Sequence, residues 1–438
     1  MILRRSMVFG LVALLLQSCI LHTETIMYEE EDLVDVAYYV PTYETTRQLT
    51  AKVSVTPAKD YAVAGKIITY QNYIFVNRPN EGIHVVDNSD PANPINLHFI
   101  TIPGSLDMAI IDNHLYTDMY SELVVFDISD VTQPQLIEEF TASDVFYYNP
   151  YTFIEDAVTT QTYDFVQYET IDASRGIVTG WEIDIRREPS EEWMRNYATL
   201  EMAVDTPTAT SDASAEGMQT STAGSMTRFL PVDRYLYTIN FNELVLFSIG
   251  ENYAPNRFAR LDTGTQAETL FQLNDLLFVG STTGMLMYDV SAPGNPDYLN
   301  SINHFRSCDP VVADAEYAYV TLRGGTNCFT ESNELQIIDI RNPEELRVVA
   351  RQAMYNPHGL AIHEDHLIIC DGSAGLKVVN VSQRTAPRVV TIEPIPFAYD
   401  IILNYPTAVV VGESRLYQYD LSALPVVTKT AEIALSAD

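Results

Sequence analysis

The chain contains, at Glu122–Pro134, the stretch ELVVFDISDVTQP, a short hydrophobic strand that ends in an aspartate and runs into a turn with proline. Six more stretches share this pattern, and their residues equivalent to Asp127 are Asp87, Ser248, Asp289, Asp339, Asn380 and Asp420. Consecutive members of the set lie 40, 121, 41, 50, 41 and 40 residues apart. A period of about 40 residues is typical of a propeller blade with four strands. The repeat therefore predicts an all-β chain folded as a seven-bladed β-propeller.

Each repeat divides into four strands. In the second repeat, MAII at Met108–Ile111 and the segment LYT precede the anchor strand, and PQLIEEFTA includes the strand after the turn. Apolar runs separated by polar turns are typical of strands buried between neighbouring blades. Two segments fall outside complete repeats, AKVSVTP near Ala51 and VVTKTAEIALS near Val426. We expect them to pair with each other and close the ring, which would leave no exposed strand edge.

The step of 121 residues indicates a long insertion, residues 141–225, between blades 2 and 3. Its clearest strand is IVTGWEIDIRR at Ile177–Arg187, whereas residues 207–225 are rich in Ser, Thr, Ala and Gly and lack apolar periodicity. The latter composition predicts disorder. Two degenerate blades would also fit the length, but propellers rarely exceed about eight blades. The propeller is therefore predicted over residues 49–438, interrupted by this insertion.

The first residues are typical of a processed export signal. Arg4 and Arg5 form a basic region, and Met7–Leu16 is an apolar stretch too short to span a bilayer. The sequence LQSC that follows resembles a bacterial lipobox, in which the cysteine is acylated and becomes the mature N-terminus. We therefore expect a lipoprotein signal peptide at residues 1–18 and lipid attachment at Cys19. The alternative is an ordinary secretory signal in which Cys19 is incidental.

Residues 19–48 carry no repeat and are predicted to hold the lipidated cysteine and a tether. Acyl chains hold a protein firmly to a membrane, since each buried methylene contributes about 0.8 kcal/mol. An aspartate after the cysteine would resemble an inner-membrane retention signal, but Ile20 stands there. We therefore predict an anchor in the outer membrane, with the propeller either periplasmic or exposed at the cell surface. The acidic run Glu29–Asp32 is an export tag to that surface or a solvated part of the tether.

The formal net charge of −34 excludes one class of partner. A surface this acidic repels phosphate backbones, so we expect no nucleic acid ligand. The same charge is compatible with cations, basic proteins and neutral glycans. We predict contact with the lipid membrane through acylated Cys19 and a protein or glycan partner.

Three further cysteines are present. Cys308 and Cys328 lie 20 residues apart in one repeat, and in an oxidising compartment this pair predicts a disulfide. Closing such a loop would stabilise the fold by roughly 3 kcal/mol. The alternative is a metal site that adds His304, although neither cysteine has a CxxC partner. Cys370 falls within a strand and is predicted to be a buried free thiol.

The stretches ELVVFDISD and ELQIIDIRNPEE, together with the lipobox, resemble the LVIVD-repeat family, many of whose members are predicted lipoproteins of Bacteroidota. The stretches CDPVVADAEYAYVTLRGG and LIICDGSAGLKVVN are similar to the most distinctive blades of that group. The resemblance covers residues 61–140 and 226–425 and leaves the insertion unexplained. It implies a β-propeller lipoprotein of the cell envelope, and it supplies no catalytic residues.

Alignment of the repeats places seven equivalent residues at the start of the innermost strands, where a propeller lines the mouth of its central channel. They are Lys66, Asp107, Arg228, Thr269, Asp309, His358 and Tyr399. Carboxylates, cations and a histidine that converge on one axis are suited to a charged ligand, a polar sugar or a metal. Asp107, Asp309 and His358 would suit a divalent cation if they lay within reach of one another. The alternative is that these positions are polar because a channel mouth is wet, and we predict no other cofactor.

Two other motifs are interpreted as structural. His363 and His366 fall in the turn between the first and second strands of their repeat, at the end opposite the channel mouth, where solvated side chains are expected. Arg323-Gly324-Gly325 is interpreted as a permissive turn rather than an anion site. Neither motif is expected to take part in function.

The sequence contains no HExxH, GxSxG, P-loop or zinc CxxC motif. We therefore favour a non-enzymatic, envelope-anchored propeller that binds or scaffolds protein or glycan partners. The alternative is an extracellular glycan-active hydrolase or lyase that uses Asp107, Asp309 and His358 at the channel mouth. Trp181 and Trp193 in the insertion would form a glycan or protein platform, or would fix the insertion to the propeller.

Overall fold

The computed structural model describes residues 33–59, 65–142, 145–146, 150, 165–189, 222–303, 310–324, 333–413 and 415–434. The chain divides into two compact units. Of the described residues, 33–41, 165–170 and 181–189 belong to the smaller unit and the others to the larger one. None of the helices in these ranges is long and apolar enough to cross a membrane.

A three-stranded sheet in the order β11-β1-β12 carries the smaller unit. Its strands are β1 (Leu33–Glu44), β11 (Phe165–Tyr168) and β12 (Ile177–Pro189), with β1 parallel to β11. Aromatic side chains pack on this sheet. The rings of Tyr39 and Tyr168 lie 5.2 Å apart, and buried Trp181 meets Tyr168 edge to face. The strand predicted within the insertion is confirmed as β12.

Two parts of the chain differ from the sequence predictions. Residues 33–48, expected to belong to a tether, form β1 and part of helix α1 (Thr46–Thr50). Their partner strands come from the insertion, and such long-range pairing leaves no period in a sequence. Residues 222–225, expected to be disordered, contain strand β13 (Thr222–Ala223) and the buried pair Gly224-Ser225. The predictions for Cys19, Trp193, Cys308, Cys328 and residues 207–221 fall outside the described residues.

The described residues of the larger unit form seven antiparallel sheets, each built on four strands that follow one another along the chain. In the first sheet, β2 (Ser54–Pro57) and β13 extend the two edges of this set. The first three sheets contain β3 (Ile67–Tyr70), β4 (Tyr73–Arg78), β5 (Gly82–Asp87) and β6 (Ile95–Thr101); β7 (Met108–Ile111), β8 (His114–Met119), β9 (Glu122–Asp127) and β10 (Gln135–Leu136); and β14 (Phe229–Val232), β15 (Tyr235–Asn240), β16 (Glu243–Ile249) and β17 (Pro255–Asp262).

The other four sheets contain β18 (Ala267–Leu273), β19 (Leu276–Ser281), β20 (Gly284–Asp289) and β21 (Asp297–Asn303); β22 (Val311–Ala313), β23 (Tyr317–Leu322), β24 (Glu334–Asp339) and β25 (Arg347–Ala353); β26 (Leu360–His363), β27 (His366–Cys370), β28 (Leu376–Asn380) and β29 (Arg388–Glu393); and β30 (Ala398–Asn404), β31 (Thr407–Gly412), β32 (Arg415–Asp420) and β33 (Thr428–Ala434). Short 3-10 turns lie at η2 (Glu138–Phe140) and η5 (Ala173–Arg175). These bounds match the four strands expected in each repeat.

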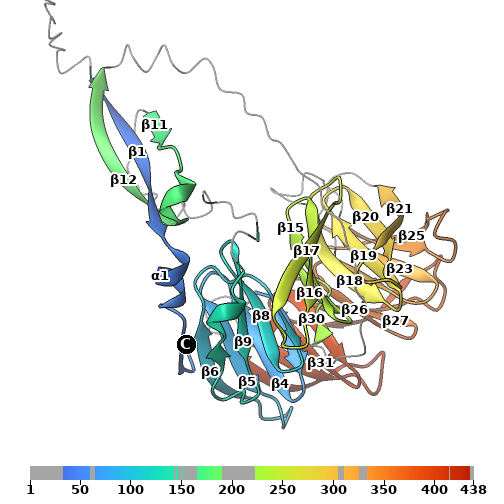
Figure 1. Cartoon of the computed structure of the whole chain (residues 1–438). Helices are drawn as coiled ribbons and strands as arrows, with labels where there is room; N and C mark the ends of the chain where they lie inside the picture. The colour runs from blue at the N-terminus through green and yellow to red at the C-terminus, as the bar shows by residue number, and fades with distance from the viewer. Residues whose placement is uncertain are drawn as a thin grey trace, which may run out of the picture. The chain divides into compact units, whose positions relative to one another are not determined.

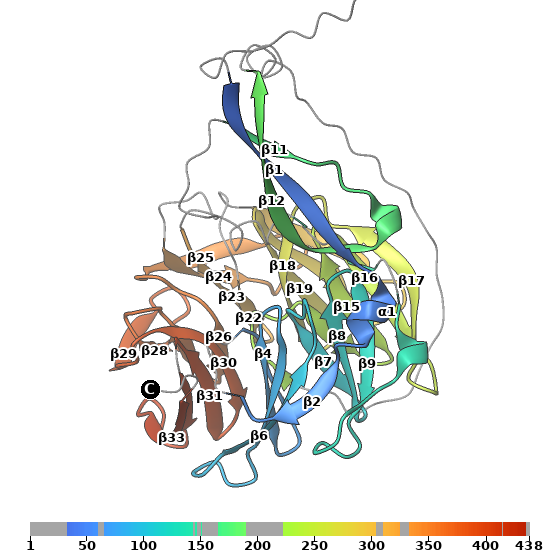
Figure 2. The same cartoon turned by 90° about the vertical axis from the view of Figure 1, so that its left-hand side faces the viewer.

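Consecutive sheets pack on each other through buried apolar side chains, each worth about 1.5–3 kcal/mol when removed from water. The last sheet packs on the first in the same way, through one cluster that joins Ile402 and Val409 to Ile67 and Val76. The innermost strands touch in the order β3, β7, β14, β18, β22, β26, β30 and back to β3. Figures 1 and 2 show these sheets in chain order, from blue to red.

The predicted pairing between the two end segments is wrong. Strand β2 pairs with β6 at one edge of the first sheet, and β33 pairs with β32 in the last. The tail follows the turn after Asp420, so it becomes the fourth strand of its own repeat. The first and last sheets therefore meet through the side chains of their shared apolar cluster.

The anchor residues of the repeat hold the turn that follows the third strand. The carboxylate of Asp127 accepts a hydrogen bond from the backbone N–H of Ser129 at 2.8 Å. The same contact, from the N–H two residues onward, recurs at Asp87, Asp289, Asp339, Asn380 and Asp420. Hydrogen bonds from Ser129 stabilise the charged form and lower the pKa of Asp127. Turn geometry thus explains the acidic end of the repeated stretch.

Replacing Asp127 with alanine is expected to lower the free energy of unfolding by about 1 kcal/mol, because the backbone N–H of Ser129 loses its acceptor. The variant Asp127→Asn keeps an acceptor, as Asn380 does in its own turn, and should lose clearly less. Chemical denaturation of both variants beside the wild type measures the difference. Equal losses in the two variants would mean that charge, and not the turn contact, stabilises this position.

Candidate functional site

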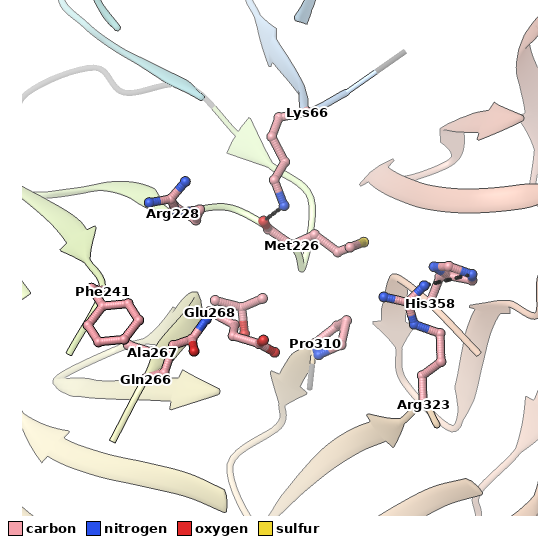
Figure 3. Close-up of a pocket in the computed structure, with 11 residues that line it drawn as sticks. Lys66, Met226, Arg228, Phe241, Gln266, Ala267, Glu268, Pro310, Arg323 and His358 are labelled. Atoms are coloured by element: carbon pink, nitrogen blue, oxygen red, sulfur yellow. Dashed lines mark hydrogen bonds between the residues drawn. The ribbon is translucent and has the colours of Figure 1, made fainter. Parts of the chain in front are cut away.

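Four of the seven residues predicted at the channel mouth line one cavity of about 330 Å³ (Figure 3). Lys66 and Arg228 immediately precede β3 and β14, His358 precedes β26, and Thr269 lies near the start of β18. The starts of four inner strands therefore supply these side chains. The other lining residues are Met226, Phe241, Gln266, Ala267, Glu268, Pro310 and Arg323.

Of the remaining three predicted residues, two lie close to this cavity. Asp107 is fully buried just before β7. Tyr399 is half-buried, and its ring centre lies 5.1 Å from that of His358. Asp309 lies outside the described residues. The six described residues of the predicted set thus lie on the cavity wall or close to it.

Residues 222–228, here called the central segment, lie among the inner strands and join several of them. Strand β13 at its start pairs with β3. Ser225 Oγ accepts a hydrogen bond from the N–H of Leu360 at 2.8 Å, and the carbonyl of Thr227 accepts one from Leu270 at 2.8 Å. At its end, the N–H of Arg228 donates to the Asp107 carboxylate at 2.6 Å. This segment therefore connects four sheets across the cavity region.

The side chain of Lys66 contacts the central segment. Its Nζ donates a hydrogen bond to the backbone carbonyl of Met226 (Figure 3). Burial lowers the pKa of Lys66, and the negative charges of Asp107 and Asp400 oppose that shift. The lysine and the two carboxylates therefore form one buried charged cluster.

Asp107 and Asp400 occupy equivalent positions at the start of their sheets. Each carboxylate accepts a hydrogen bond from the next residue, at 2.7 Å from the N–H of Met108 and 2.9 Å from that of Ile401. Asp107 lies four residues before Ile111, which pairs with His114, and Asp400 lies four residues before Asn404, which pairs with Thr407. Asp400, and not Tyr399, is therefore the structural counterpart of Asp107, and the sequence alignment is wrong by one residue here.

Asp118 in β8 is a third buried carboxylate. Its Oδ1 accepts hydrogen bonds from the N–H groups of Leu106 at 2.7 Å and Asp107 at 3.0 Å. Burial nevertheless raises the pKa of Asp118 to about 7, and it raises the pKa of Asp400 to about 7. Both groups therefore exchange protons near neutral pH.

His358 and Arg323 lie together on one side of the cavity (Figure 3). Arg323 Nη1 lies 3.5 Å from His358 Nε2. Burial, and then the nearby guanidinium, lower the pKa of His358 to about 3, so its ring is neutral at physiological pH. The rings of Phe397 and Tyr399 pack against it, with centres 5.3 and 5.1 Å away.

The described residues contain no group of three or more His, Cys, Asp or Glu side chains that could hold a metal ion. His363 and His366 flank the β26–β27 turn, as predicted, and His363 stacks on Tyr405. Cys370 is confirmed as a buried free thiol. These side chains are therefore explained by packing.

A family model described as the LVIVD repeat matches residues 63–99, 105–142 and 357–392. The chain carries LVIVD repeats. The three matched stretches correspond to the sheets β3–β6, β7–β10 and β26–β29. The resemblance to the LVIVD-repeat family is thus confirmed.

Solved structures resemble this LVIVD-repeat chain in fold. A protein from Lactobacillus plantarum is 11% identical, with a TM-score of 0.50, over 84% of this chain and 96% of its own. A functionally unknown protein from Desulfotomaculum acetoxidans is 13% identical, with a TM-score of 0.48, over 84% and 97%. BamB from Moraxella catarrhalis is 7% identical, with a TM-score of 0.41, over 85% and 94%. A comparison with curated proteins gave no match. The LVIVD repeats and the succession of four-stranded sheets identify a β-propeller.

Several residues around the cavity escape an alignment of the LVIVD repeats. Arg323 was expected to serve a turn alone, yet it lies on the cavity wall. Glu268, which also lines the cavity, immediately precedes the aligned residue Thr269. Considering the neighbours of each aligned position would therefore have found it. Asp400 is followed by Ile-Ile-Leu, much as Asp107 is followed by Met-Ala-Ile, and this pattern indicates their equivalence.

The free energy of unfolding of this LVIVD-repeat protein is expected to fall as the pH rises from about 4 to about 7. Unfolded aspartate loses its proton near pH 3.9, whereas Asp118 and Asp400 keep theirs to about pH 7 in the fold. Each such group lowers stability by roughly 1.4 kcal/mol per pH unit in this window.

The variant Asp118→Asn provides the control, because its amide oxygen still accepts both N–H groups and carries no charge. Denaturation at pH 5 and pH 8 should show a smaller decline in the variant than in the wild type. The same decline in both proteins would mean that Asp118 is ionised throughout the range.

Proposed function

We propose that this chain is a non-enzymatic binding or scaffold protein of the bacterial cell envelope. In this proposal, residues 1–18 are a signal peptide and acylated Cys19 anchors the protein to the outer membrane. Residues 49–438 form a seven-bladed β-propeller, with an insertion at residues 141–225 between blades 2 and 3. The partner is a protein or a glycan.

The packing of the sheets supports the proposed blade number. Each sheet shares an apolar cluster with the next, and the last shares one with the first. In a ring of this kind every sheet packs between two neighbouring sheets. The proposed insertion is supported by β11, β12 and β13, which all fall between the second and third sheets in the chain.

The hydrogen bonding of the Asp107 carboxylate is the observation that favours a binding role over a catalytic one. Its two carboxylate oxygens accept backbone N–H groups from Met108 and Arg228, and the residue is fully buried. An acid or base must reach its substrate, and this carboxylate is bonded to the protein itself. His358, with a pKa near 3, is a poor base at neutral pH. The hydrolase or lyase alternative thus loses two of its three residues.

The test is to purify the acylated protein from gently solubilised envelopes of its own host and identify what accompanies it by mass spectrometry. A stoichiometric protein or a bound glycan is the expected result. Preparations that contain the chain alone, under crosslinking as well as without it, would argue against a scaffold role.

The variant Cys19→Ser is expected to move most of the protein from the membrane fraction to the soluble fraction. Two or three acyl chains anchor a protein nearly irreversibly, and serine cannot accept the thioether-linked lipid. Fractionation with metabolic labelling by a radioactive fatty acid measures both effects. Substitution of buried Cys370 with alanine is the matched control and should leave labelling unchanged. Equal labelling of Cys19→Ser and wild type would contradict lipid attachment at this residue.

A further inference from the structure

A groove of about 490 Å³, here called the outer groove, lies between the third and fourth sheets. One wall is the end of β17 with the turn at residues 263–265, and the other is a face of β20 and β21. Gly284 and Tyr288 both line it, so it follows β20 for roughly 13 Å, at about 3.3 Å per residue. None of its described lining residues belongs to the wall of the central cavity. The outer groove is therefore a separate site.

The outer groove coincides with a difference between the fourth sheet and other sheets. In the third sheet, Glu243 Oε2 lies 2.9 Å from Arg260 Nη1, across the third and fourth strands. Counted from the anchor residue of each repeat, the matching ion pairs in the fifth and seventh sheets are Glu334–Arg351 and Arg415–Glu432. In the fourth sheet, Gly284 and Ser301 stand at these two positions and line the groove. Space that charged side chains fill in three sheets is therefore open in the fourth.

Ser301 in β21 is the smaller wall of this comparison. It pairs with Leu286, three residues before the anchor Asp289. The residues at the same register in five other sheets are Phe99, Arg260, Arg351, Ile392 and Glu432. Each of these side chains is much larger than that of serine. The outer groove is thus a particular feature of the fourth sheet and not a consequence of the repeat.

Tyr298 in β21 offers an aromatic face to the groove. It is 55% exposed, and its ring centre lies 5.6 Å from that of buried Tyr288 at an interplanar angle of 73°. This edge-to-face contact favours one orientation of the exposed ring. The electron-rich face of a tyrosine ring attracts the C–H groups on the apolar face of a sugar ring. An exposed tyrosine in a groove is therefore suited to a carbohydrate.

Polar groups near the turn at residues 263–265 complement this aromatic face. Thr265 Oγ1 lies 2.6 Å from Thr283 Oγ1, and Oδ1 of exposed Asp262 accepts the backbone N–H of Gly264 at 2.8 Å. A hydroxyl group is both donor and acceptor, and a carboxylate has about four acceptor positions. These groups can therefore bind the hydroxyl groups of a ligand while they keep their contacts within the fold.

The charge of the chain favours a neutral ligand over an acidic one. The formal net charge of −34 counts every residue of the sequence, and Asp262 places a carboxylate in the groove itself. Such a surface repels an acidic sugar. A carboxylate nevertheless accepts strong hydrogen bonds from the hydroxyl groups of a neutral sugar.

We propose that the outer groove binds a neutral oligosaccharide, with Tyr298 against the face of one sugar ring and Asp262, Thr265 and Thr283 as hydrogen-bond partners of its hydroxyl groups. The length of the groove exceeds that of a single sugar ring, which favours a chain of sugars. This inference rests on the proposed binding function, selects a glycan as the partner and adds the place where it binds.

The experiment titrates the full chain by calorimetry at pH 7 with cellotetraose, maltotetraose, mannotetraose and tetraacetylchitotetraose, and with tetragalacturonate and tetralysine for comparison. At least one neutral tetrasaccharide should bind with a stoichiometry of one, about tenfold or more tighter than tetragalacturonate. Binding of no neutral tetrasaccharide, or equal binding of tetragalacturonate, would overturn the proposal. Binding of tetralysine alone would also overturn it and would assign the groove to a basic peptide.

Variants of the groove locate the binding. Ser301→Arg introduces the side chain found at this register in the third and fifth sheets, so it should fill the groove and abolish binding. Tyr298→Ala should weaken binding about tenfold or more, whereas Tyr298→Phe keeps the ring and should retain most of the affinity.

Tyr355→Ala is the matched control, because this tyrosine is 63% exposed and lies between β25 and β26, away from the groove. It should leave the affinity unchanged. Thermal unfolding of each variant confirms that it folds. Equal affinity of Tyr298→Ala and Tyr355→Ala, or full binding by Ser301→Arg, would place the ligand elsewhere and overturn the proposal.

The two proposals fail separately. If no neutral tetrasaccharide binds while the chain still retrieves a protein from envelopes, the outer groove is wrong and the scaffold function stands. If a tetrasaccharide binds in a Tyr298-dependent way but no partner is retrieved from envelopes, the groove stands and the scaffold function is wrong.

Discussion

Replacing Lys66 with methionine is expected to lower the free energy of unfolding by about 3–5 kcal/mol. The lysine lies beside the buried carboxylates of Asp107 and Asp400, and their charges favour its ionised form. Methionine has a similar length but carries no charge, so it leaves both carboxylates without this cation. It also removes the hydrogen bond to the carbonyl of Met226. Chemical denaturation at pH 7 measures the loss.

The double variant Lys66→Met/Asp400→Asn is the control for this interpretation. Removing the negative charge of Asp400 together with the positive charge should restore part of the lost stability, because fewer charges then remain buried. The same experiment at pH 5, where Asp400 holds its proton in the fold, should show a smaller loss for Lys66→Met alone. A loss that is independent of pH and not relieved by Asp400→Asn would assign the effect to packing.

Replacing Gly224 with alanine is expected to cost about 1–3 kcal/mol, since it forces a methyl group into a closely packed site. A Cβ atom there would lie 2.3 Å from Oδ2 of Asp400, and one at Gly359 would lie 2.1 Å from Oδ1 of the same residue. The Asp400 carboxylate is thus enclosed by two glycines. The substitution should separate the central segment, residues 222–228, from the start of β30.

Hydrogen exchange followed by mass spectrometry localises this effect. Faster exchange is expected in residues 222–228 and around Leu360, whose N–H donates to Ser225. Gly250→Ala is the control, because its nearest neighbour is the end of the Asn252 side chain at 3.0 Å, which can move. Unchanged exchange in the central segment of the Gly224→Ala variant would contradict the close packing described for Asp400.

The strands of the larger unit are predictable from sequence because the same local sequence pattern recurs in each repeat. Asp127 and its counterparts stabilise the same turn in most of the repeats, so one local interaction recurs with the repeat. Lys66, Arg228 and Thr269 each lie four residues before the last paired residue of their first strand, which is why the alignment found them together. His358 lies one residue further from that end of its strand. A turn or strand that depends on local sequence in one repeat can therefore be predicted in the next repeat.

The features that escaped prediction depend on contacts between distant residues. Asp400 was missed because Asn404, a residue typical of turns, belongs to β30 and pairs with Thr407, so the turn begins one residue later than the alignment assumed. Strand β1 was mistaken for a tether because its partner β11 lies more than 120 residues further along the chain. The central segment was missed because its sequence has no apolar period. Its hydrogen bonds go to inner strands that are distant in sequence and not to a neighbouring hairpin.

The central segment has a consequence for the kinetics of folding. Met226 meets Lys66, 160 residues earlier, and Ser225 meets Leu360, 135 residues later. Two sheets of the larger unit precede this segment in the chain and five follow it, so we expect its contacts to form only after both groups have assembled around it. Contacts between such distant residues slow folding, because loop entropy is lost before they form. Maturation of the centre is therefore expected to be the last and slowest phase of refolding, after the individual sheets have acquired their strands.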